Sequence, residues 1–193
     1  MKRAVFLDRD GVLNEPVLDP VDGKAESPLR AADVALCRGA ADAVISIAGL
    51  GFEPVVVTNQ PAAAKGKASV TEIFEINNRV RQLLADQGAD IETWKICLHH
   101  PDAVVAELGG ECGCRKPAPG MLLEAAGELE LSLPDSWIVG DSDADIGAGK
   151  AAGCRTVLVE HPLTAHRRSA GSDADVTVSD LPAAALILQG ESA

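Results

Sequence analysis

Two aspartates, Asp8 and Asp10, stand two residues apart at the end of the apolar run AVFLD, and both could take part in phosphate chemistry. A carboxylate can attack phosphorus and form an aspartyl-phosphate. A second carboxylate nearby can protonate the leaving oxygen and then activate water. The same two residues could also simply end a strand and begin a turn, because aspartate is common in turns.

Further polar residues follow two other apolar runs of the chain. Residues 58–60 (TNQ) end one run, and Asp141, Asp143 and Asp145 follow another. Because ligands bind beyond the carboxyl ends of parallel strands, these groups should meet at one edge of a sheet. Clustered carboxylates repel one another without a cation, and their hard oxygen atoms suit Mg²⁺. Thr58 and a lysine would then bind the phosphoryl oxygens.

A second set of residues has the spacing of a metal site. Cys97 and His99 are separated by one residue, as are Cys112 and Cys114, and twelve residues lie between the two pairs. Four such ligands match a tetrahedral Cys₃His zinc site of the structural kind. Free thiols remain an alternative. A disulfide within C-x-C would be strained, and a redox pair more often reads C-x-x-C.

The predicted zinc loop, about residues 97–116, ends in two cations. Arg115 and Lys116 directly follow the second cysteine pair. Ordering long side chains costs conformational entropy, and a metal-fixed base lowers that cost. We therefore expect the zinc to aim these cations at the carboxylates. Cys37 should be a small, buried apolar residue, and no partner is evident for His161.

Strand-like and helical stretches alternate along the chain. This alternation predicts an α/β fold, a single doubly wound parallel sheet (Rossmann-like) in one domain over residues 1–193. Long connections are expected at 14–38 and 98–117, where function is common. The expected strands are 4–8, 54–59, 94–98, 137–141, 156–160 and 176–178; the expected helices are 39–50, 71–87, 118–130, 143–152 and 181–189.

The composition argues against several classes of partner. The net charge of −12 argues against a nucleic-acid-binding surface, which would show a basic patch or stripe. It also makes attraction to anionic lipid unfavourable. No apolar run approaches the ~18 residues of a membrane span. The apolar stretch after Lys2 and Arg3 stops at Asp8, too early for a signal peptide. We expect a cytoplasmic protein, monomeric, with neither nucleic acid nor membrane as partner.

Taken together, FLDRDGVLN, VVVTNQ, CRKPAPGM and VGDSDAD resemble, in order, the four motifs of the haloacid dehalogenase (HAD) phosphatase superfamily, over residues 4 to 160. The resemblance implies that Asp8 is the nucleophile and Asp10 the general acid/base. Thr58 and Lys116 would bind phosphate. The Mg²⁺ ligands that it implies are Asp8, the backbone carbonyl of Asp10, Asp141 and, as a further acidic position, Asp145.

The cysteine-containing loop resembles the histidinol-phosphatase-like subgroup (IIIA) of that superfamily, which has no large cap domain and includes heptose-bisphosphate phosphatases. It implies a small sugar-phosphate substrate, most similar to that of the heptose enzymes. The residues expected to contact substrate are Asn59, Gln60, Lys65 and Arg115. The segment PAAAKG departs from the usual Ser-Gly-Ile-Ala-Arg-Gly. The alternative enzymes are a histidinol-phosphate phosphatase and a phosphatase for another sugar phosphate. The alternative outside the enzymes is a catalytically inactive binding module that keeps the zinc site.

Overall fold

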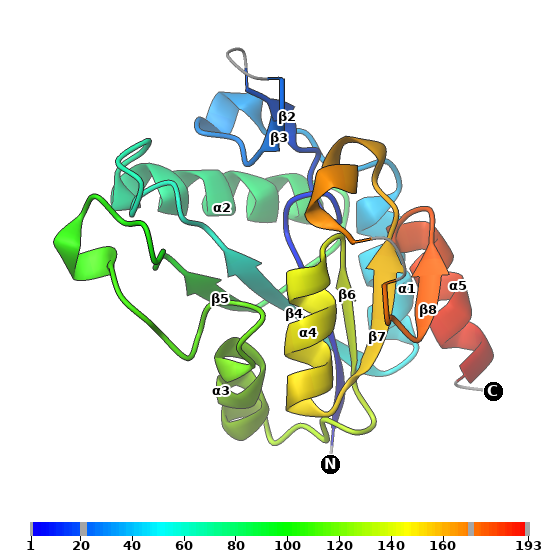
Figure 1. The fold of residues 1–193 in the computed structure, drawn as a ribbon. Coiled ribbons are helices and arrows are strands. Elements are labelled where there is room, and N and C mark those ends of the chain that lie inside the picture. The colour runs from blue at the N-terminus through cyan, green and yellow to red at the C-terminus, as the bar shows by residue number, and fades with distance from the viewer. Residues whose placement is uncertain (1, 20–22, 170–171, 192–193) are drawn as a thin grey trace.

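The computed structural model describes residues 2–19, 23–169 and 172–191, and its centre is a six-stranded sheet in which every neighbouring pair of strands is parallel (Figure 1). The strand order is β5-β4-β1-β6-β7-β8. This arrangement confirms the predicted doubly wound α/β fold. The strands are β1 (Arg3–Leu7), β4 (Phe52–Asn59), β5 (Thr93–Cys97), β6 (Trp137–Gly140), β7 (Arg155–Val159) and β8 (Val176–Val178).

The central strands are apolar on both faces, as expected for a sheet covered on both sides. In β1, Val5 and Leu7 belong to one buried cluster, whereas Ala4 and Phe6 belong to the other. Successive side chains of a strand point to opposite faces, so one continuous apolar run supplies two cores. This explains why AVFLD shows no alternation of polar and apolar residues.

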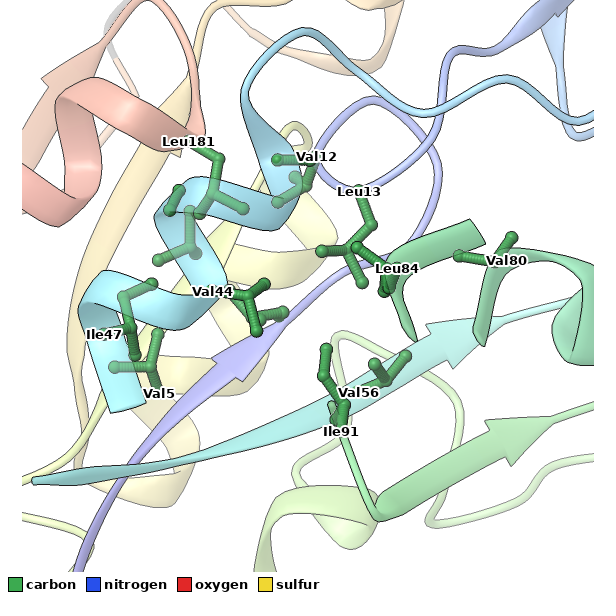
Figure 2. Close-up of a cluster of buried hydrophobic side chains, with 14 of the residues drawn as sticks. Val5, Val12, Leu13, Val44, Ile47, Val56, Val80, Leu84, Ile91 and Leu181 are labelled. Atoms are coloured by element: carbon green, nitrogen blue, oxygen red, sulfur yellow. The ribbon is translucent and has the colours of Figure 1, made fainter. Parts of the chain in front are cut away.

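Five α-helices cover the sheet in the described part of the chain. The larger core joins α1, α2 and α5 to one face, and the smaller core joins α3 and α4 to the other. Figure 2 shows part of the larger core, where Val44 and Ile47 of α1 lie near Val5 of β1. The helices are α1 (Ala40–Gly49), α2 (Val70–Ala85), α3 (Gly120–Leu129), α4 (Asp143–Ala152) and α5 (Leu181–Glu191).

The connection expected at 14–38 contains a short antiparallel hairpin of β2 (Val17–Leu18) and β3 (Ala25–Glu26). The hairpin lies beyond the carboxyl ends of the sheet strands (Figure 1). Three short 3-10 helices, η1 (Ala31–Asp33), η2 (Ala106–Leu108) and η3 (Pro162–Arg167), complete the described structure. Within the described residues, no helix is both long and apolar enough to cross a membrane.

Candidate active site

Three buried carboxylates meet at the carboxyl edge of the sheet. Asp8 follows β1, Asp141 follows β6, and Asp145 lies in the first turn of α4; each offers an oxygen within 4.8 Å of the others. The sheet topology explains the meeting, because β1 and β6 are neighbours. We call these residues the carboxylate cluster. Asp143, which was expected in the same group, lies outside it and accepts from the Ser169 amide at 2.7 Å.

The carboxylate cluster is electrostatically incomplete on its own. Burial, together with the charges of the neighbouring aspartates, raises the pKa of Asp8 to about 6 and that of Asp141 to about 8. Both carboxylate oxygens of Asp141 are buried, and neither has a hydrogen-bond partner within the described structure, although Arg167 Nη1 forms an ion pair with Oδ2 at 3.6 Å. Buried carboxylate oxygens that accept no hydrogen bond are the donors that Mg²⁺ prefers. The residues present thus fit a magnesium ion between Asp8 and Asp141.

Lys116 supplies the positive charge closest to the nucleophile candidate. Its Nζ lies 2.9 Å from Asp8 Oδ1 and donates to Asp145 Oδ1 at 2.5 Å and to the Val57 carbonyl at 2.7 Å. Burial lowers the pKa of Lys116, but the two carboxylates outweigh it, so the pKa is raised. The ammonium group therefore stays charged against the cluster.

Asn59 fixes the backbone at Lys116 from the neighbouring strand β4. Its Nδ2 donates to the Lys116 carbonyl at 3.0 Å, and its Oδ1 accepts from the Lys116 amide at 3.1 Å. The two bonds resemble those between paired strands. Asn59 lines the cavity, yet both ends of its amide are already engaged with the backbone.

Asp10 is held by hydrogen bonds from four side chains. Its Oδ1 accepts from Arg9 and Asn14, and its Oδ2 accepts from Ser27 at 2.7 Å and Gln60 at 2.8 Å, with Arg9 also reaching it. Burial opposes ionisation, but Arg9 and the other donors lower the pKa to about 2. Asp10 is therefore a carboxylate in this arrangement.

Thr58 and Gln60 lie side by side in the same buried region. Gln60 Nε2 donates to Thr58 Oγ1 at 2.9 Å as well as to Asp10. The Thr58 hydroxyl accepts this bond and keeps its own proton for another acceptor. Gln60 is fully buried, so its amide orders these two residues and does not face the cavity.

A cavity of about 370 Å³ opens above the carboxylates. Its walls carry Lys65, Arg115 and Arg167 in addition to Lys116. Arg115 donates to the His99 carbonyl at 3.1 Å, and Arg167 donates to the Ala25 carbonyl at 3.0 Å. The local site is thus rich in cations although the chain is acidic overall.

The four predicted zinc ligands lie together at one side of this cavity. The Sγ atoms of Cys97, Cys112 and Cys114 are 3.2–3.7 Å apart, and His99 Nδ1 lies 3.4 Å from Cys114 and 3.8 Å from Cys97. Zn–S bonds of about 2.3 Å and Zn–N bonds of about 2.0 Å give tetrahedral edges of this size. All five cysteines are free, so no disulfide competes. The donor set fits zinc, and we call it the cysteine cluster.

Several contributors to the site were not predicted from the sequence. Arg9 is fully buried between Asp10 and Asn77 of α2, whose Oδ1 accepts from Arg9 Nη1 at 2.6 Å. Ser27 and Arg167 reach the site from the hairpin region and from η3. An arginine flanked by two aspartates is a usable signal for Arg9. Ser27 and Arg167 carry no comparable signal, since distant loops bring them in.

Comparison with known proteins finds relatives over nearly the whole chain. A HAD-hydrolase-like family model matches residues 113–184. The D-glycero-beta-D-manno-heptose-1,7-bisphosphate 7-phosphatase of Yersinia pestis is 36% identical, with 94% of each chain covered. The D-glycero-alpha-D-manno-heptose-1,7-bisphosphate 7-phosphatase of Photorhabdus laumondii subsp. laumondii is 34% identical, covering 84% of this chain and 86% of its own.

A solved structure shares the whole architecture. The D,D-heptose 1,7-bisphosphate phosphatase of B. bronchiseptica, crystallised with magnesium and phosphate, is 28% identical and superimposes with a TM-score of 0.80. The superposition covers 99% of both chains. The similarity therefore includes the sheet and the loops around the cavity.

Proposed function

Since the chain belongs to the HAD-like phosphatase family, we propose that it hydrolyses the 7-phosphate of a D-glycero-D-manno-heptose 1,7-bisphosphate through a phosphorylated Asp8. The observation that carries this proposal is the contact between Asp8 and Lys116 at the floor of a cation-lined cavity. The names of the relatives support the substrate.

In the first step, an oxygen of the Asp8 carboxylate attacks phosphorus, and the bond from phosphorus to the sugar oxygen breaks. Lys116 stabilises the negative charge of the phosphoryl group, and the Thr58 hydroxyl donates to one of its oxygens. Lys116 already touches Asp8 at 2.9 Å, so it spans nucleophile and phosphate.

Asp10 carries the proton in both steps. It gives a proton to the departing sugar oxygen, and it later takes one from the water that attacks the phosphoryl-Asp8. The second step releases inorganic phosphate and restores Asp8. The hydrogen bonds from Arg9, Ser27 and Gln60 favour the ionised form, which is the form that accepts the proton. Before the first step Asp10 takes up a proton from solvent, which requires the substrate to displace some of these bonds.

Asp8, Asp141 and the backbone carbonyl of Asp10 would hold Mg²⁺, which supplies charge neutralisation for the attacking and transferring oxygens. Asp145 takes a different role in this proposal. Its two oxygens accept from Lys116 and from the Ser142 amide and hydroxyl at the start of α4. It therefore positions Lys116 and caps the helix.

The cations on the cavity walls suit a substrate with a second phosphate. Lys65 and Arg115 line the cavity beyond Lys116 and would bind the phosphate that is not transferred. Relatives named for the alpha and the beta anomer are similarly identical to this chain. Both anomers should therefore be assayed as substrates. Zinc bound by the cysteine cluster would fix the loop that presents Arg115.

The mechanism is tested by Asp8→Asn, which removes the nucleophile while keeping its size. Phosphate release should become undetectable, with the circular dichroism spectrum and the zinc content unchanged. Turnover that persists in this variant would refute the mechanism. Wild-type phosphate release should have its highest kcat/KM on one of the heptose bisphosphates. A higher value on histidinol phosphate would favour that substrate, and no release from any monoester would favour a binding module.

A further inference from the structure

A second group of metal-binding side chains lies outside the proposed active site. Glu15, Cys37 and His161 each offer a ligand atom, and the three atoms lie within 4.8 Å of one another. They come from the loop after β1, the segment before α1 and the residues after β7. We call them the rear cluster. His161 has a partner in Glu15 that was not evident from the sequence, and Cys37 packs against the larger core, as expected for an apolar residue, while lying beside both.

The backbone places these side chains before any ligand arrives. The Glu15 amide donates to the Ala35 carbonyl at 2.9 Å, and the Cys37 amide donates to the Leu13 carbonyl at 2.9 Å. These bonds tie the segments that carry Glu15 and Cys37 to each other. His161 Nε2 lies 2.9 Å from Glu15 Oε2. The cluster is thus held by contacts across three loops, which favours binding over chance proximity.

The rear cluster borders a cavity of its own, of about 330 Å³. Arg38 and Asp180 lie on the walls of the same cavity and add one charge of each sign. The space leaves room for a water molecule beside three protein ligands. A site with three protein ligands and an open fourth position is the usual pattern of an accessible zinc site.

Gly11 separates this cavity from the active site. Gly11 lines the rear cavity, and a side-chain carbon at this position would lie 2.4 Å from Asp141 Oδ2 on its other side. With φ at +85°, the residue also needs the conformational freedom of glycine. The rear cluster therefore lies behind the turn that carries Asp10, one backbone thickness from the carboxylates.

We propose that Glu15, Cys37 and His161 form a second metal site for a borderline divalent ion, Zn²⁺ or Co²⁺. A thiolate, an imidazole and a carboxylate together select such ions over Mg²⁺, which prefers oxygen ligands alone. The cysteine cluster is a separate site in another loop, so the chain would hold two ions of this class.

Binding changes the protonation of the rear cluster in a defined way. In the metal-free protein His161 Nδ1 accepts from the Leu163 amide at 3.3 Å, so Nε2 carries the proton and donates to Glu15. When the ion takes Nε2, that proton moves to Nδ1, and the amide of the exposed Leu163 turns to water. The Cys37 thiol releases its proton to solvent. Each ion bound therefore releases one proton.

The proposed ion would brace the turn behind Asp10. Asn14 Nδ2 donates both to Asp10 Oδ1 at 3.0 Å and to the Glu15 carbonyl at 2.9 Å. Holding Glu15 in place would therefore hold Asn14 and, through it, one oxygen of Asp10. The ion would act on position and would not touch substrate.

The test counts zinc equivalents by mass spectrometry of full-length protein that has been stripped, reloaded with Zn²⁺ alone and desalted. Cys37→Ala should hold one equivalent fewer than wild type, and Cys154→Ala, which alters a buried cysteine outside both clusters, should match wild type. Loading with Co²⁺ should give a sulfur-to-cobalt absorption band that loses intensity in Cys37→Ala.

His161→Gln is the second variant, in case Cys37→Ala does not fold. It should also hold one zinc equivalent fewer than wild type, while the cysteine cluster keeps its own zinc. Equal zinc content in wild type, Cys37→Ala and His161→Gln would overturn the proposal and leave a hydrogen-bonded triad. The readout is metal content, so it stands or falls independently of the phosphatase reaction.

Discussion

On one side of the active-site cavity, the loop of residues 97–116 is held by contacts among its own side chains and by the sheet. The cysteine cluster joins its two ends, and Asn59 clamps the backbone at Lys116. On the other side, the β2–β3 hairpin and η3 are held by side chains. Lys67 pairs with Glu26 at 2.7 Å, and Arg167 reaches the Ala25 carbonyl.

The two walls differ in how easily they can move. The Lys67–Glu26 pair is more than one-third exposed on each side chain, and exposed pairs of this kind contribute roughly 0–1 kcal/mol. With the proposed zinc bound, the loop of residues 97–116 would not open without losing ligands. The rigid wall, residues 97–116, carries Lys116 and Arg115, and the adaptable wall, the β2–β3 hairpin with η3, lines the same cavity with Glu26 and Arg167. The lysine that contacts Asp8 therefore lies on the wall that is held more firmly.

The largest effect is expected at the rigid wall, from Lys116→Met. The change removes a buried charge that contacts Asp8, and losing one such stabilising group costs about 10²–10³-fold in kcat. The measurement is kcat on p-nitrophenyl phosphate, with Lys65→Met as the matched control on the cavity wall. A Lys116→Met enzyme that keeps a tenth of the wild-type kcat would remove the distinction between the walls.

Next in size is the loss of the zinc ligand in Cys114→Ala. The loop that carries Lys116 should lose its metal and its rigidity, which we expect to lower the melting temperature by about 10 °C, since 1 kcal/mol is worth about 2–4 °C in a chain of this size. Differential scanning calorimetry measures this. Cys154→Ala is the control, and an equal shift in both variants would show that the cluster does not brace the wall.

A smaller, pH-dependent effect concerns the floor between the walls. The folded pKa values of about 6 for Asp8 and about 8 for Asp141 lie above those of the unfolded chain. The native state therefore binds more protons, and without Mg²⁺ the free energy of unfolding should fall as pH rises from 5 to 8. Mg²⁺ at a hundredfold its Kd adds about 2.7 kcal/mol.

Urea unfolding at pH 5 and pH 8, with and without Mg²⁺, measures this effect. The stabilisation by Mg²⁺ should be larger at pH 8, because the ligand carboxylates are then ionised without competition from protons. Asp141→Asn should abolish most of it. Equal stabilisation at both pH values would place the ion elsewhere.

The smallest effect is expected at the adaptable wall, from Lys67→Ala. Losing the exposed pair with Glu26 should change the free energy of unfolding by about 1 kcal/mol or less. The value of kcat/KM on the heptose bisphosphate should fall severalfold, with kcat on p-nitrophenyl phosphate unchanged. The control is Lys95→Ala, which breaks the pairs with Glu124 and Glu128 away from the cavity. It should leave kcat/KM on the heptose bisphosphate and kcat on p-nitrophenyl phosphate unchanged.

The features that were predictable from the sequence are those with local patterns. Apolar runs of strand length predicted the strands of the sheet, and the paired spacing of cysteines and histidine predicted the cysteine cluster. Both signals lie in residues that are close together in the sequence. The hairpin was not predicted, since β2 and β3 have two residues each and no apolar alternation. Arg167, Ser27 and the rear cluster depend on contacts between distant loops, which no local pattern encodes.

The roles of Asn59 and Gln60 show a further limit of sequence reading. Their position after β4 indicates the site, and the structure does place them there. Their type alone cannot tell a group that contacts substrate from one that orders its neighbours. Hydrogen bonds to the Lys116 backbone and to Asp10 indicate the second role.

The amide of Asn59 recognises the backbone of residue 116 and not its side chain, and this has a consequence for how the loop can vary. Between His99 and Cys112, the Val104 and Val105 amides donate to the Ala64 carbonyl at 2.8 and 3.2 Å, and Leu108 packs against the larger core. Insertions or deletions in this span should therefore be tolerated where they leave these contacts in place. An insertion between Cys114 and Lys116 would shift the lysine out of register with Asn59. A transplant of this loop into another phosphatase should therefore include the asparagine and keep the contacts of Val104, Val105 and Leu108.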